Sequence, residues 1–131
     1  LLALSKLDDK PESLHYIALV RALMCESLAE YFQSQSKDLF YTVGLLSCLD
    51  AFFDQIIDQV VSHVMLDESI SMALLSYSGD AGLALETTLN FEQSHWQKLN
   101  WEKLGAFDLN IKKISTIYYE CSTLAMSLQD T

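Results

Sequence analysis

Proline is almost absent from this chain, and this limits the folds that it can adopt. Its 131 residues include one proline, Pro11, and four glycines, while apolar residues recur at steps of three or four. Such spacing is typical of amphipathic α-helices, whereas half-buried strands alternate polar and apolar residues between turn signals such as Asn-Gly. The chain has few runs of that alternating kind. The sequence therefore predicts an all-α fold.

The apolar spacing predicts about six to seven helices in a helical bundle, within a single domain at 1–131. The first complete helix is expected to begin near Pro11, because proline is favourable at the first helical position. The expected helices that follow lie at 38–53 or 54, 57–64, 67–76, 81–96, about 100–105, and 108–128.

The opening segment, LLALSKL, is apolar from its first residue and has no initial methionine. We expect residues 1–9 to be the tail of a preceding helix, so that the chain is a fragment of a longer polypeptide. Loss of earlier helices would expose apolar surface, and exposed patches beyond a few hundred Å² tend to associate. We therefore expect a homo-oligomer, formed through the face around the first two helices.

The charge balance argues against nucleic acid and membranes as partners. Eighteen acidic and eight basic residues give a net charge of −10, and only Lys112 and Lys113 are adjacent basic residues. Such a surface repels phosphate backbones and anionic lipids. The longest stretches without charge, 39–49 and 69–79, are shorter than the roughly 20 apolar residues of a membrane span. We expect a cytoplasmic protein.

The cysteines and histidines show no metal-ligand spacing. An odd number of cysteines without a C-x-x-C motif favours buried free thiols over a disulfide framework or a zinc site. No histidine has a second ligand three or four residues away, as helical metal sites do. These residues are Cys25, Cys48 and Cys121, with His15, His63 and His95. We expect no cofactor.

Three aspartates, Asp50, Asp54 and Asp58, are spaced by four residues. On one continuous helix they would form a carboxylate column able to bind a divalent metal or to act in acid–base chemistry. The preferred interpretation is a solvated edge, in which one helix ends near Asp54 and Asp58 begins the next, because like charges at this spacing are mildly destabilising. Asp50 is the exception, because it falls on an apolar stripe.

Two charged residues fall on apolar stripes of their helices. Arg21, the sole arginine of the chain, lies between Ile17 and Met24, and Asp50 follows Leu46. Charged side chains are seldom buried without a partner. The sequence therefore predicts a structural ion pair or hydrogen bond between Arg21 and Asp50.

Four segments together resemble a known family. They are LVRALMCESLAEYF at 19–32, YTVGLLSCLDAFFDQ at 41–55, VMLDESISMALLSYSGDAG at 64–82, and the helix at 118–128. The sequence is similar to the C-terminal two thirds of an HDOD domain, of the kind that follows an EAL domain in bacterial signalling proteins. The resemblance covers the chain from about Lys10 and implies an HD-like helical bundle that lacks the first HDOD helices.

The HDOD resemblance aligns Gly44, Ser47 and Cys48 with a motif of metal-dependent enzymes. In the wider HD phosphohydrolase superfamily the corresponding helix reads G-L-L-H-D, and its His-Asp pair binds the catalytic metal. In this sequence Gly44 keeps the glycine position, while the His-Asp pair falls on Ser47 and Cys48. Hydroxyl and thiol groups do not replace imidazole and carboxylate at a hard-metal site. We expect a degenerate site, with Gly44 retained for close helix packing.

The resemblance implies a non-catalytic regulatory or protein-interaction module of a signalling protein linked to cyclic di-GMP. Its partner would be another protein or the neighbouring EAL domain. Two alternatives stay open. One is an HD-type metal-dependent phosphohydrolase with ligands among the histidines, Asp50 and Asp54. The other is an unrelated helical adaptor, whose upstream reading frame would encode no EAL domain.

Overall fold

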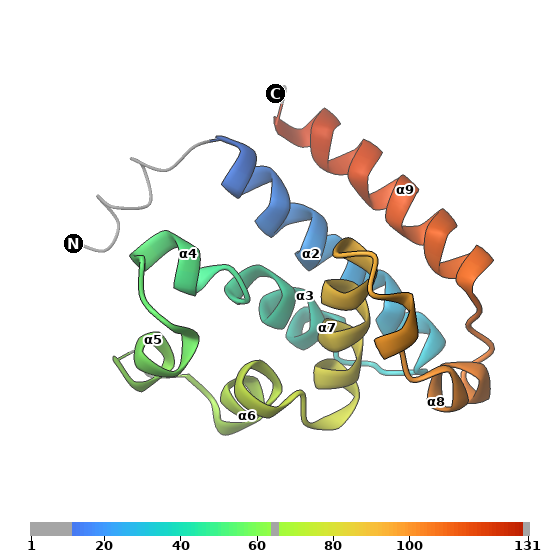
Figure 1. The fold of residues 1–131 in the computed structure, drawn as a ribbon, viewed down its shortest axis with the longest axis horizontal. Coiled ribbons are helices and arrows are strands. Elements are labelled where there is room, and N and C mark those ends of the chain that lie inside the picture. The colour runs from blue at the N-terminus through green and yellow to red at the C-terminus, as the bar shows by residue number, and fades with distance from the viewer. Residues whose placement is uncertain (1–11, 64–65, 130–131) are drawn as a thin grey trace.

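A computed structural model describes residues 12–63 and 66–129, and this part of the chain is helical with no strand. Its eight α-helices and one 3-10 helix confirm the predicted all-α bundle (Figure 1). The labels follow Figure 1, and the helices are α2 (Glu12–Tyr31), α3 (Lys37–Leu46), α4 (Leu49–Phe53), α5 (Ile57–His63), α6 (Glu68–Ser76), α7 (Gly79–Glu92), η1 (Trp96–Lys98), α8 (Trp101–Ala106) and α9 (Ile111–Gln129). The expected helix tail at 1–9 lies outside the described residues.

Helix α2 is the centre of the bundle. It packs against α3, α7 and α9, and Figure 1 shows α9 running beside it along one edge. Buried residues therefore occur on several sides of α2 rather than on one stripe, as expected for a helix that neighbours surround. They are Ala18, Val20, Ala22, Met24, Cys25, Leu28 and Ala29.

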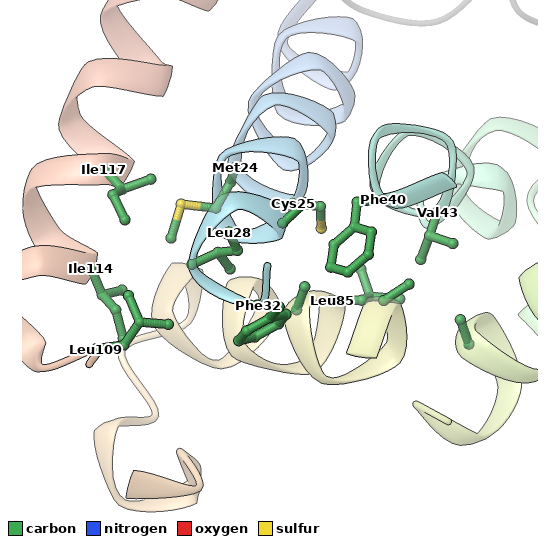
Figure 2. Packing of buried hydrophobic residues seen from close by; sticks show 14 of the residues in the cluster. Met24, Cys25, Leu28, Phe32, Phe40, Val43, Leu85, Leu109, Ile114 and Ile117 are labelled. Atoms are coloured by element: carbon green, nitrogen blue, oxygen red, sulfur yellow. The ribbon is translucent and has the colours of Figure 1, made fainter. Parts of the chain in front are cut away.

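The main core forms where α2, α3, α7 and α9 meet (Figure 2). Met24 and Leu28 of α2, Phe40 of α3, Leu85 of α7 and Ile114 of α9 are almost completely buried. Burying each such side chain contributes roughly 1.5–3 kcal/mol to the free energy of folding. This core fixes the position of α7 relative to α2.

The predicted helix at 38–53 or 54 is two helices, which accounts for one of the helices beyond the expected six to seven in residues 12–63 and 66–129. Helix α3 ends at Leu46, and α4 begins at Leu49. The Ser47 hydroxyl donates a hydrogen bond of 2.6 Å to the Gly44 carbonyl, and Cys48 leaves the helical region with φ −94° and ψ 2°. Serine side chains that bond to nearby carbonyls compete with helix continuation.

The other expected helices occur, with shifted ends. Helix α7 extends from Gly79 to Glu92 and α9 begins at Ile111. None of the helices in the described part of the chain is long and apolar enough to cross a membrane.

Candidate functional site

Arg21 joins the centre of α2 to the end of α7. Its Nε donates to Glu92 Oε2 at 2.9 Å, and its Nη2 donates to Glu92 Oε1 at 2.7 Å. The two side chains are 16% and 19% exposed, so water screens this bidentate pair only in part. Burial lowers the pKa of Arg21, but the Glu92 hydrogen bonds and nearby negative charges raise it by more. The guanidinium therefore stays charged.

The predicted pairing of Arg21 with Asp50 is wrong in its partner. Glu92 takes the ion pair, while the Asp50 carboxylate accepts from the backbone N–H of Ala51 at 2.8 Å. Asp50 acts on Arg21 through its charge, which is the smallest of the influences that raise the Arg21 pKa. The physical reason is the break after Leu46, because Asp50 was placed by continuing the α3 stripe through a single helix.

Glu92 is the site residue that the sequence reasoning missed. A signal for it exists, because Glu92 follows Leu85 and Leu89 at helical spacing on the apolar side of α7. This is the same kind of signal that identified Arg21 as a buried charge.

Ser47 and Cys48 lie against the same guanidinium. Arg21 Nη1 donates to Ser47 Oγ at 3.4 Å and to Cys48 Sγ at 3.3 Å. Burial raises the pKa of the Cys48 thiol, and the charge of Arg21 lowers it by less. Cys48 therefore carries a neutral thiol at neutral pH. The Ser47 hydroxyl and the Cys48 thiol thus both face the Arg21 cation.

Gly44 brings α3 into contact with the backbone of α2. A Cβ built at Gly44 would clash with the Arg21 carbonyl oxygen and lie 2.8 Å from Ala22 Cα. The close approach expected at this glycine is present, and it sets Ser47 next to Arg21.

Among the residues that the structure describes, the candidate metal ligands do not gather into one site. The His15 ring packs edge-on against Phe52 at 5.1 Å between centroids, and His95 is exposed just before η1. The side chain of His63 lies outside the described residues. Across 12–63 and 66–129, no three His, Cys, Asp or Glu side chains gather closely enough to hold a metal ion.

The aspartate series is split between two helices, which confirms the preferred interpretation of its spacing. Helix α4 ends at Phe53, and Asp54 follows it with a left-handed φ of 55°. Asp58 lies in the first turn of α5. The three carboxylates therefore do not form a column on one helix.

Comparison with known proteins found two relatives and no matching family model. The chain is 30% identical over 104 residues to the cyclic di-GMP phosphodiesterase CdgJ of Vibrio cholerae, a match that covers 78% of the chain and 24% of CdgJ. It is 28% identical over 80 residues to the uncharacterized protein YuxH of Bacillus subtilis, covering 61% of the chain and 20% of YuxH. The chain thus spans about a quarter or less of these relatives. No solved structure matches.

Proposed function

We propose that the chain is a non-catalytic regulatory module of a bacterial signalling protein linked to cyclic di-GMP, acting on a protein partner or a neighbouring EAL domain. The observation that carries the proposal is the 30% identity to CdgJ over 78% of the chain. Because the match covers only 24% of CdgJ, the larger part of that phosphodiesterase lies outside it. This supports a role beside a catalytic domain.

The surroundings of Ser47 and Cys48 support the non-catalytic part of the proposal. A phosphohydrolase metal needs carboxylate or imidazole ligands. Here the two positions offer a hydroxyl and a neutral thiol, and both accept from the Arg21 guanidinium. Neither group supplies the carboxylate or imidazole ligand that such a metal requires.

One experiment tests the absence of catalysis. The purified chain is incubated with cyclic di-GMP and with bis(p-nitrophenyl) phosphate, in the presence of Mn²⁺ or Mg²⁺. We expect no turnover above the buffer blank. Metal-dependent turnover that EDTA abolishes would contradict the proposal and favour the HD-type phosphohydrolase.

A second experiment tests regulation. Cyclic di-GMP hydrolysis is measured for the full-length protein that carries this chain and for a variant from which residues 1–131 are deleted. We expect the rate to change, because a regulatory module alters the activity of the domain that it contacts. An unchanged rate would rule out regulation in cis and leave recruitment of a separate protein as the output.

A further inference from the structure

A cavity of about 180 Å³ opens next to the Arg21 guanidinium. Its wall includes the almost fully buried Leu85 of α7, and its polar lining is formed by Arg21, Ser47, Asp50, Tyr77 and Gln93. Tyr77 and Gln93 are exposed, so they belong to the rim. The lining is thus mixed, with polar groups converging on a smaller apolar part. Convergent polar groups of this kind fix the orientation of a small ligand.

The charges around the cavity favour a neutral ligand group that donates hydrogen bonds. Arg21 is balanced by Glu92, and the Asp50 carboxylate adds a second negative charge. The local sum is one negative charge, which disfavours the entry of a phosphate. Asp50 accepts a bond from the Ala51 backbone, and a carboxylate has room for further donors.

Arg21 keeps a donor for a ligand on the same side. Its Nε and Nη2 donate to Glu92. Its Nη1 makes two weaker hydrogen bonds, one of 3.4 Å to Ser47 Oγ and one of 3.3 Å to the Cys48 sulfur, which is a weak acceptor. A carbonyl oxygen or ring nitrogen is a better acceptor than a thiol. A ligand with an acceptor next to its donor edge would therefore strengthen the contacts of Nη1.

Tyr77 supplies an aromatic ring at the rim, on a constrained backbone. Its φ of 54° lies in the left-handed region, because Tyr77 is the residue that ends α6 and its backbone N–H donates to the Ala73 carbonyl. The turn is fixed from the other side, because a Cβ built at Gly82 would clash with the Tyr77 backbone. Tyr77 is 40% exposed, and its ring is available for stacking.

We propose that this cavity binds a guanine base. Guanine presents N1–H and an amino group that Asp50 can accept, and O6 and N7 acceptors that suit an arginine donor. Tyr77 offers a face on which the ring can stack. The volume is below the roughly 300–1,000 Å³ of sites for drug-sized ligands, so the base enters while ribose and phosphate stay in solvent. The choice of guanine among planar bases rests on the proposed link to cyclic di-GMP.

The test is a ¹H–¹⁵N NMR titration of the 131-residue chain with GMP, cyclic di-GMP and AMP. We expect GMP to shift the amide signals of Tyr77 and Gln93, and AMP to bind at least about tenfold more weakly, since one specific bidentate contact discriminates by that amount or more. If cyclic di-GMP binds more tightly than GMP, the ligand that supplies the guanine base is the dinucleotide. If GMP binds more tightly, the ligand is the mononucleotide. Either order supports the guanine site.

Two variants locate the site. Asp50→Asn keeps the size of the side chain, removes its charge and replaces one of its two acceptor oxygens with an NH2 donor. The bidentate contact with N1–H and the amino group is then lost, so we expect about a tenfold loss of GMP affinity. Asp58→Asn, on α5 outside the cavity lining, is the matched control and should bind GMP as the unchanged chain does. Equal binding of GMP and AMP, no binding of either, or full affinity in Asp50→Asn would overturn the inference. If deletion of residues 1–131 changes the hydrolysis rate but GMP does not bind, the guanine site is refuted and the proposed regulatory function is retained.

Discussion

The Arg21 guanidinium contacts three side chains from two other places in the chain. It reaches Glu92 of α7 through two hydrogen bonds, and Ser47 and Cys48 at the junction of α3 and α4 through one each. A half-buried charge with this many partners is costly to disturb, because removing one member leaves the others desolvated and unpaired.

We expect Arg21→Ala to lower the free energy of unfolding by about 3 kcal/mol, the low end of the range for breaking a buried ion pair, because both side chains keep some exposure. Urea denaturation measures the change. Glu92→Gln and the double variant complete a cycle that isolates the pair. Lys37→Ala, in the exposed Lys37–Glu30 pair, is the control and should change little. A similarly small effect of Arg21→Ala would show that the pair does not hold α2 to α7.

Gly44 and Gly105 offer a matched pair of glycines inside helices. A Cβ at Gly44 would clash with the backbone of Arg21 and Ala22, whereas a Cβ at Gly105 would have no neighbour within 4 Å. We expect Gly44→Ala to destabilise the protein by about 1–3 kcal/mol through overpacking. Gly105→Ala should stabilise it by about 0.5–1 kcal/mol through helix propensity. Thermal denaturation of both variants checks the signs, and equal shifts would refute the close approach of α3 to α2.

At the scale of helices, α9 begins with a side-chain cap. Asn110 Oδ1 accepts from the backbone N–H of Lys113 at 2.9 Å, and Ile114 in the next turn is fully buried. We expect Asn110→Ala to cost about 1 kcal/mol of stability, because one N–H at the helix start loses its acceptor. Asn110→Asp keeps the acceptor and places a negative charge at the positive end of the helix, so stability should be retained. If chemical denaturation shows that Asn110→Asp is as unstable as Asn110→Ala, the capping role of Asn110 is refuted.

Which helices exist could be predicted from the sequence, because apolar spacing and the rarity of proline act locally. The break at Ser47 and Cys48 could not, because neither residue is a helix breaker and the hydrogen bond of Ser47 to Gly44 competes only slightly with the helix. The missed break also misplaced Asp50. The position of Gly44 against α2 was predictable, because a glycine in a buried helical run is costly unless a neighbour needs the space.

The partner of Arg21 shows the limit of such prediction. Its burial could be inferred from the stripe on α2, but Glu92 lies 71 residues away. The choice between two acidic residues depends on how α7 packs on α2, which is a property of the whole core. The same is true of the cavity, whose lining comes from residues between Arg21 and Gln93.

For the molecule as a whole, the three buried cysteines make the free energy of unfolding depend on pH in the alkaline range. Cys25, Cys48 and Cys121 are free and buried, as expected from their number and spacing. Burial raises the pKa of each thiol, and that of Cys25 reaches about 12 despite its contact with Thr88, which lowers it. In the unfolded chain a cysteine titrates near pH 8.5. Above that pH the folded protein therefore binds more protons than the unfolded chain.

The sign of the pH dependence follows from linkage. A pKa that is raised in the folded state contributes stability fully below the unfolded pKa and loses it as pH rises toward the folded value. We expect the free energy of unfolding to fall between pH 8.5 and about 12, with Cys25 contributing a slope of about 1 kcal/mol per pH unit. Urea denaturation from pH 7 to 10.5 measures the fall, and Cys25→Ser should make it shallower whatever its stability at pH 7. An unchanged slope in Cys25→Ser would mean that this thiol ionises alike in both states, against the complete burial of its side chain in the core between α2 and α7.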